Sequence, residues 1–148
     1  MNVSDEQVVR PHVRRVEKPW GWEILWAEEA PHYVGKLLHV DAGKRLSLQY
    51  HDEKLETQCL LSGRVLLVVE DAEGALQEIE MEPGEGYTIH PFQRHRLVAI
   101  TDAEVVEVST PETGTTFRLD DDYARPHETE ELRRTLSPAN PRATVATK

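Results

Sequence analysis

Short apolar runs, separated by turn-forming residues, follow one another from Trp22 to about residue 110. Each run is short and many are rich in β-branched residues, which is typical of strands and too short for most helices. Glycine, proline and aspartate mark many of the turns between the runs. So many strands with turns this close together predict an all-β antiparallel sandwich or barrel. The runs cover residues 22–27, 33–40, 45–51, 56–61, 64–70, 75–81, 86–91, 95–100 and 104–110.

The two ends of the chain lack this pattern. Residues 1–18 show no clean period, so we expect an N-terminal arm before a single domain over residues 19–125. Within residues 126–148 we expect a short C-terminal helix and a flexible tail. The helical segment, 125–136, has acidic residues early and arginines late, as the helix dipole prefers.

Net charge and composition limit the classes of molecule that this protein is expected to bind. The formal net charge of −10 argues against a nucleic-acid partner, which would need a basic face, whereas one phosphorylated metabolite needs only a few local cations. No apolar run approaches the ~20 residues of a membrane span, and the first residues do not resemble a signal peptide. The single cysteine, Cys59, excludes an internal disulfide, so we expect a cytoplasmic protein with no membrane partner.

The run over residues 45–51 carries an unusual number of polar side chains. Because side chains alternate along a strand, Arg45, Ser47, Gln49 and His51 share one face. If that face lines the interior of a barrel, four polar residues are costly to bury unless water, a metal or a ligand satisfies them. The strand is therefore a candidate functional element.

A metal site is the specific form of this prediction. A tight turn brings Glu56 back beside His51, so that Gln49 adds an amide oxygen to an imidazole and a carboxylate. His95, at the start of a later strand, supplies a fourth ligand. Taken alone, a histidine in a strand is more often structural, but the joint pattern suits one divalent ion such as Zn, Mn, Co, Ni or Fe.

The spacing of these residues resembles the first motif of the cupin superfamily. Gly43, Gln49, His51, Glu56 and Gly63 stand at the cupin intervals, with the glutamine replacing the first histidine of that motif. The resemblance implies a single cupin jelly-roll barrel that holds one metal ion.

The second cupin motif is also similar. Gly84, Ile89, Pro91 and His95 match it, but Phe92 stands where the motif has its usual glycine. We therefore expect the backbone of that turn to be built differently.

Within the cupins, the glutamine narrows the resemblance to the phosphomannose isomerases. The type II form of that family is similar to this chain over about residues 14–125, in the segments RRVEKPWGWEIL, GKRLSLQYH, HRL and FRLDDDYAR. Among the departures from the pattern of that family are two that bear on the substrate. Thr57-Gln58 replaces a His-Trp pair, and Ala124 replaces a glycine between Tyr123 and Arg125.

The resemblance implies interconversion of mannose 6-phosphate and fructose 6-phosphate, with the small-molecule substrate a sugar phosphate. Lys54 is the candidate catalytic residue, although a solvated turn lysine is as good an interpretation. Arg45 and Arg118 are candidates for substrate binding, Arg118 also fitting a surface pair with the nearby aspartates. The general base stays open among Lys54, His90 and Glu53.

Two other functions fit the same residues. One is a metal-dependent cupin enzyme of another type, a dioxygenase, decarboxylase, dehydratase or epimerase on a small acid or sugar derivative. The other is a non-catalytic accessory protein that binds a sugar phosphate. The shared face of Trp22, Ile24 and Trp26 is expected to be buried in the core or against a second subunit, which makes a homodimer our prediction.

Overall fold

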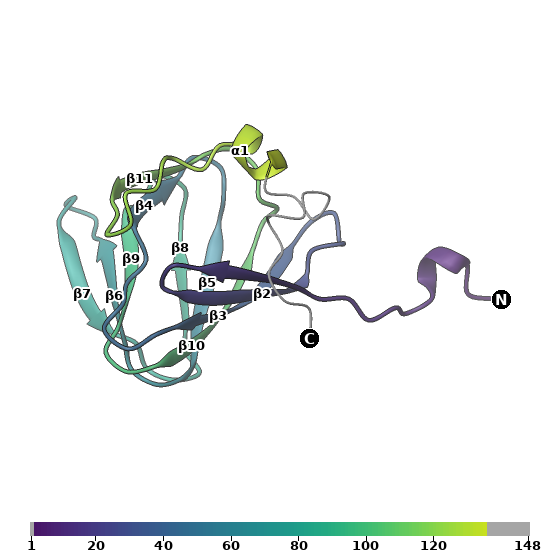
Figure 1. Cartoon of the computed structure of the whole chain (residues 1–148), viewed down its shortest axis with the longest axis horizontal. Helices are drawn as coiled ribbons and strands as arrows, with labels where there is room; N and C mark the ends of the chain where they lie inside the picture. Colours follow the sequence, from purple (N-terminus) through teal and green to yellow (C-terminus); the bar gives the residue numbers. More distant parts are fainter. Residues whose placement is uncertain (1, 136–148) are drawn as a thin grey trace.

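The computed structural model describes residues 2–135, which form two antiparallel sheets that face each other (Figure 1). One sheet has six strands in the order β1-β2-β3-β10-β5-β8, and the other has five in the order β11-β4-β9-β6-β7. The all-β jelly roll predicted from the sequence is confirmed. The strands are β1 (Arg14–Lys18), β2 (Gly21–Ala27), β3 (Val34–Val40), β4 (Leu48–His51), β5 (Glu56–Ser62), β6 (Val65–Glu70), β7 (Leu76–Glu80), β8 (Gly86–Ile89), β9 (His95–Ala99), β10 (Ala103–Ser109) and β11 (Thr116–Asp120).

Each of the nine apolar runs contains one strand, from β2 to β10. The largest difference between a predicted run and its observed strand is at residues 45–51, because regular strand pairing begins only at Leu48. Arg45 makes an isolated bridge to Val98, and residues 46–47 leave the strand. The strict alternation expected over the whole run is therefore broken near its start.

The expected N-terminal arm is shorter than predicted. Residues 14–18 are β1, an edge strand that pairs with β2, so they belong to the sheet. The residues before β1 extend away from the barrel and include the 3-10 turn Asp5–Gln7 (Figure 1).

The C-terminal helix is also shorter than predicted. Helix α1 covers Glu130–Thr135 rather than 125–136. Before it the chain runs extended, and Glu128 exchanges two backbone hydrogen bonds with Thr116 on β11. The predicted tail, with residue 136, lies outside the described residues. None of the helices within residues 2–135 has the length and apolar character to cross a membrane.

The interior of the barrel has an apolar end and a charged end. Toward one end, Leu38, Val105 and Leu60 lie side by side across β3, β10 and β5 and belong to the main apolar cluster. Two residues along the same strands, the row becomes charged and polar: Lys36, Glu107 and Gln58. The apolar end supplies the burial that stabilises the fold, at roughly 1.5–3 kcal/mol for each fully buried aliphatic side chain. The charged end therefore sits on a rigid scaffold.

The tryptophan face of β2 points outward, against one of the two expectations. Glu23 and Leu25 are the buried residues of this strand, whereas Trp26 is 45% exposed. Trp26 lies close over Gly35 of β3, where any Cβ would fall 2.6 Å from its ring. The prediction that this face is buried in the core is therefore wrong for the described residues.

Phe92 adopts the backbone conformation that glycine favours. Its φ is 66°, and its amide donates a 2.6 Å hydrogen bond to the carbonyl of His51. Ala124, at the other position where the family resemblance expects glycine, has a φ of 51°. Phe92 therefore takes a left-handed conformation at a steric cost, at a position where the family resemblance expects glycine.

Candidate metal centre

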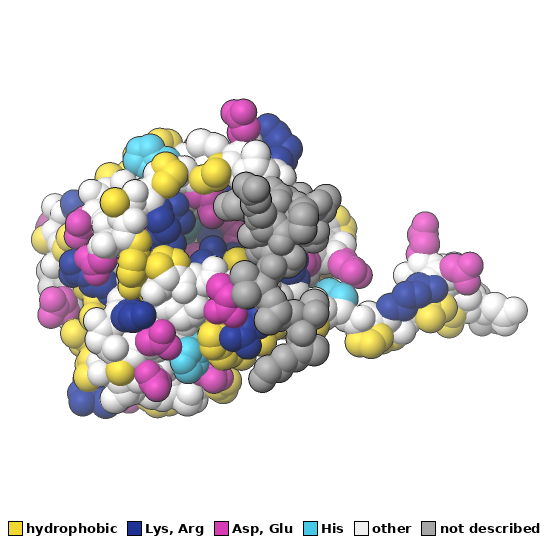
Figure 2. Space-filling model, viewed as in Figure 1, with side chains coloured by type: hydrophobic (Ala, Val, Ile, Leu, Met, Phe, Trp, Pro, Cys, Tyr) yellow, Lys and Arg dark blue, Asp and Glu magenta, His cyan; other side chains and the backbone are white. Residues whose placement is uncertain are grey.

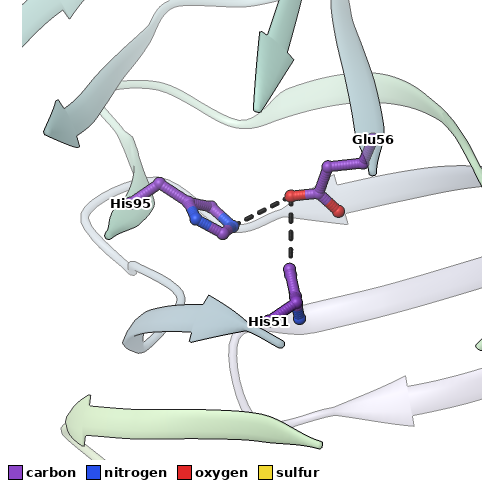
Figure 3. A group of neighbouring side chains, drawn as sticks. All are labelled: His51, Glu56 and His95. Atoms are coloured by element: carbon purple, nitrogen blue, oxygen red, sulfur yellow. Dashed lines mark ion pairs between the residues drawn. The ribbon is translucent and has the colours of Figure 1, made fainter. Parts of the chain in front are cut away.

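Three buried side chains from three strands converge on one point between the sheets (Figure 3). His51 ends β4, Glu56 begins β5 and His95 begins β9, so chain reversals bring them together. One ligand atom from each lies within 4.8 Å of the others. Glu56 Oε1 is 2.9 Å from His95 Nε2 and 3.6 Å from His51 Nε2.

Hydrogen bonds on the far side of each imidazole fix its orientation. His95 Nδ1 lies 2.9 Å from the carbonyl oxygen of Gln93, to which it donates, and His51 Nδ1 lies 2.8 Å from the hydroxyl of Thr116. Burial lowers the pKa of His51, which favours the neutral ring. In both rings Nδ1 is used by its far-side partner, so Nε2 is the ring nitrogen that faces Glu56.

The converging atoms lack hydrogen-bond partners. Both Nε2 atoms and both carboxylate oxygens of Glu56 are buried without a hydrogen bond, although the ammonium group of Lys54 lies 3.1 Å from Oε2 of Glu56 as an ion pair. Lone pairs held this close repel unless a cation lies between them, and buried polar atoms are rarely left unpaired. Imidazole nitrogens and a carboxylate suit one divalent transition metal ion, and the far-side hydrogen bonds are those that support metal-binding histidines.

Gln49 lies beside this group. Its backbone is in register with His95 on one side and Arg118 on the other, and it lines the interior cavity. The hydroxyl of Ser47 donates a 2.7 Å hydrogen bond to its amide oxygen. That bond leaves a second lone pair on the oxygen for a further ligand.

Lys54 is buried against three carboxylates, so it is not a solvated turn lysine. Its ammonium group lies 3.1 Å from Glu56, 3.4 Å from Glu107 and 3.4 Å from Glu112. Burial opposes its charge, but Glu107, Glu112 and Glu56 outweigh burial and raise the pKa of Lys54 well above its usual range. Lys54 is therefore a fixed positive charge beside the three candidate metal ligands.

A wider charge network continues from Lys54 along the six-stranded sheet. Lys36 contacts Glu112 and lies 3.9 Å from Glu23, which also pairs with Lys18 at 3.7 Å. Burial alone would raise the pKa of Glu112, but Lys36 and Lys54 hold it well below its usual range. Burial would lower the pKa of Lys36, but Glu112 and Glu23 raise it. The lysines and most of these carboxylates are thus charged together.

The charged residues of this network line a cavity of about 910 Å³. The cavity reaches the candidate metal site at His51 and Gln49, which also line it. Figure 2 shows a hollow in the barrel with basic and acidic side chains around it. Seven lysine or arginine residues and seven glutamates line the cavity, so its wall is close to neutral. The cations are Arg14, Lys18, Lys36, Lys54, Arg118, Arg125 and Arg133, and the carboxylates are Glu17, Glu23, Glu28, Glu29, Glu107, Glu112 and Glu128.

The two arginines expected to bind substrate lie in different places. Arg118 lines the cavity, donates to the carbonyl of Pro126 at 2.6 Å, and keeps a buried Nε without a partner. Arg45 lies outside the cavity lining and makes a two-pronged ion pair with Asp122 at 2.8 Å. Its expected inward position fails because the strand is irregular between Arg45 and β4.

The charged residues of the six-stranded sheet were missed by the sequence analysis. Glu107 follows Val105 by two positions and Lys36 precedes Leu38 by two, so both share the inward face with a buried apolar residue. A charged residue at a core position of an apolar strand was the signal available. Glu112 lies in a loop, where no such signal exists.

Comparison with known proteins gives the fold. No family model and no curated protein sequence matches the chain. KdgF from Halomonas sp. matches in structure with a TM-score of 0.57 at 17% identity, over 64% of this chain and 83% of that one. Oxalate decarboxylase from Lactobacillus farciminis, as a formate complex, matches with 0.62 at 19%, over 74% and 34%. The Bacillus subtilis oxalate decarboxylase matches with 0.61 at 18%, over 74% and 30%.

The chain thus spans about a third of the length of these oxalate decarboxylases. At these identities the likeness concerns the fold alone. Together with the two facing antiparallel sheets and the buried His51, Glu56 and His95, it shows that this chain has the cupin jelly-roll fold.

Proposed function

We propose that this protein is a metal-dependent enzyme that moves a proton at a carbon next to a carbonyl group in a sugar or sugar-acid derivative. The observation that carries the proposal is the convergence of buried ligand atoms from His51, Glu56 and His95 beside a large cavity, whose lining includes His51. We assign the ligands as these three residues and Gln49.

The chain supplies the other groups that such chemistry needs. A divalent ion bound at the site would supply Lewis-acid polarisation of a substrate oxygen. The ammonium of Lys54 is placed to stabilise negative charge that develops on that oxygen. Arg118, with its unpaired Nε, is placed to hold a polar or anionic end of the substrate.

The size of the cavity favours a sugar derivative. Ligand pockets for molecules of several rings or chains measure about 300–1,000 Å³, and about 910 Å³ is far more than a two-carbon acid fills. Interconversion of mannose 6-phosphate and fructose 6-phosphate, the reaction implied by the sequence resemblance, is the first member of this class to assay.

The second candidate is a decarboxylation or oxidation of a small acid. Its support is the structural likeness to oxalate decarboxylases and to an oxalate oxidase in complex with glycolate. Oxygen uptake, or carbon dioxide release from oxalate, by the metal-loaded protein would favour this candidate over proton transfer.

Metal binding is tested before activity. Metal-free protein is titrated with Mn, Zn, Co, Ni and Fe salts, and the bound metal is counted by elemental analysis. We expect one ion per chain. In Glu56→Gln we expect affinity to fall by more than the roughly 10–100-fold that loss of a supporting hydrogen bond causes. Glu85→Gln, an exposed turn residue, is the matched control. No stoichiometric metal in the wild type would refute the proposal.

Activity is then assayed on the loaded protein. Mannose 6-phosphate is supplied in D₂O, and both fructose 6-phosphate formation and deuterium entry at carbon are followed. Turnover would support the isomerase. Exchange into related sugar acids without isomerisation would support the wider class. One bound metal with neither result, together with oxygen uptake or decarboxylation, would replace the proposal with the second candidate.

We also propose that two copies pair through the outer face of the six-stranded sheet. Its central row holds Ile24, Leu37, Val106 and Cys59 in register, flanked by exposed Trp26, Val108 and Leu61. Uncharged residues over four strands are unusual on a solvated sheet face. Light scattering should give a dimer for the wild type and a monomer for Val108→Glu. Leu76→Glu, at an exposed position on β7 of the other sheet, is the control and should stay a dimer.

A further inference from the structure

The carboxyl group of Glu107 lies in the charged end of the barrel, and no short contact holds it. It lies on β10, is 5% exposed, and lines the cavity with His51 and Lys54. Its two contacts are long: 3.4 Å from Lys54 Nζ and 3.3 Å from the amide of Gln58, which donates to it. Charge-assisted hydrogen bonds are usually about 2.7–2.9 Å.

Charge counting around Glu107 leaves one negative charge in excess. Among the described residues of this cluster there are four carboxylates and three ammonium groups. The tighter contacts commit the lysines elsewhere, since Lys36 contacts Glu112 and Lys54 is nearest to Glu56. The four carboxylates are Glu23, Glu56, Glu107 and Glu112, and the ammonium groups are Lys18, Lys36 and Lys54.

We propose that Glu107 carries a proton in the metal-free protein, loses it when a divalent ion binds, and is then the base that accepts a proton from the substrate. A divalent ion adds two positive charges beside Glu56 and removes the excess that the proton had balanced. This inference rests on the proposed function for the loss of the proton on metal binding and for the role as base, but not for the proton on Glu107 in the metal-free protein.

The groups that face Glu107 agree with this assignment. Lys36 faces it from β3, Gln58 and Glu56 from β5, Lys54 from the turn before β5, and Glu112 from the loop after β10. Burial, together with the charge of Glu56, raises the pKa of Glu107 to about 7, against the opposing effect of the two lysines. No other carboxyl in the described cluster shows a raised pKa.

The proton transfer balances without a further reactant. The C–H bond next to the substrate carbonyl breaks, its proton forms an O–H bond on Glu107, and the electron pair moves to the carbonyl oxygen. Return of the proton to the former carbonyl carbon, with passage of the adjacent hydroxyl proton to the former carbonyl oxygen, completes an isomerisation and restores the carboxylate. Sequence analysis left the base open among Lys54, His90 and Glu53. Lys54 is paired with carboxylates, and neither His90 nor Glu53 lines the cavity.

Two measurements that need no substrate test the first steps. Infrared spectra of the metal-free protein should show the C=O band of a protonated carboxyl at pH 6 that disappears as the pH rises past about 7. Glu107→Gln should lack this band, whereas Glu104→Gln, on the outer face of the same strand, should keep it. Calorimetric titration with Mn at pH 6, in buffers of different ionisation enthalpy, should release about 0.9 more protons from wild type than from Glu107→Gln.

The outcomes separate this inference from the proposed function. Absence of the band in wild type, or its persistence in Glu107→Gln, overturns the proton on Glu107 even if metal binds. Equal proton release by both proteins overturns its displacement by metal. If no metal binds, the proposed function fails and the displacement with it, while the infrared band still decides where the proton lies. For the last step, Glu107→Gln should bind metal normally yet lose at least about 100-fold in deuterium exchange. Undiminished exchange would overturn the role as base.

Discussion

Replacing Lys54 with methionine tests whether the buried charges depend on one another. Methionine keeps the length of the side chain and its apolar stem, so the change removes mainly the ammonium group. Glu56, Glu107 and Glu112 all lie within 3.4 Å of that group, and all are buried or nearly so. Lys54→Met therefore leaves three carboxylates with reduced compensation.

The cost follows from what happens when one partner of a buried ion pair is removed. Such a change costs roughly 3–5 kcal/mol, and for a chain of this size that lowers the melting temperature by roughly 10–15 °C. Lys44→Met is the matched control, because Lys44 is exposed and its ion pair with Asp41 is long at 3.7 Å. It should change the free energy of unfolding by less than about 0.5 kcal/mol.

The assay is urea denaturation of the metal-free proteins at pH 7, followed by circular dichroism. Adding Glu56→Gln to Lys54→Met should recover about 1–2 kcal/mol, because the second change removes the carboxylate that lies nearest to the missing ammonium group. A loss below about 1 kcal/mol in Lys54→Met would refute the reasoning. So would a double variant whose losses simply add, since neighbours in one network are expected to couple.

Three further changes have expected outcomes in thermal or urea denaturation. Gly63→Ala should cost roughly 2–4 kcal/mol, because at a φ of 82° its Cβ would fall 2.2 Å from the carbonyl of Asp102; Gly74→Ala, at the same φ with open space, should cost about 1 kcal/mol. Equal costs would contradict the steric account. Phe92→Gly should stabilise the protein by roughly 0.5–1 kcal/mol, since relief of the left-handed strain exceeds the entropy that glycine loses. Because its folded-state pKa is lowered, Glu112 stabilises the fold above pH 4.5 and loses that effect as the pH falls through the folded value, so Glu112→Gln should flatten the loss of stability between pH 5 and 2. An unchanged acid profile would count against that ion pair.

Much of the fold was predictable because strands that bury one face carry apolar residues at regular positions in the sequence. Strands β2 to β10 each alternate or carry an apolar run, and the turns between them hold glycine, proline or aspartate. Strand β1 was missed because charged residues dominate its run, Arg14-Arg15-Val16-Glu17-Lys18. Strand β11 was missed because only two of its five residues, Phe117 and Leu119, are apolar. Their pairing depends on β2 and β4 rather than on burial of their own side chains.

The candidate site was predictable where the ligands follow one another closely in sequence. His51 and Glu56 flank one tight turn, so local geometry alone brings them together. The placement of Arg45 failed because local irregularity before β4 changed which way its side chain points. Glu107 escaped notice because its importance comes from tertiary contacts with Lys54 and Gln58, far away in sequence.

The three tryptophans lie within seven residues of one another, yet their surroundings differ. Trp20 is 3% exposed and lines the cavity, Trp22 stacks on His39 at 4.8 Å, and Trp26 is 45% exposed on the outer face. Indole fluorescence depends on local polarity and on quenching neighbours, so each ring is a separate built-in reporter. A protein that keeps only Trp20 should signal occupancy of the cavity by a colourless molecule, and one that keeps only Trp26 should signal pairing of two copies. Ligand screening and assembly can therefore be followed optically, without attaching a dye.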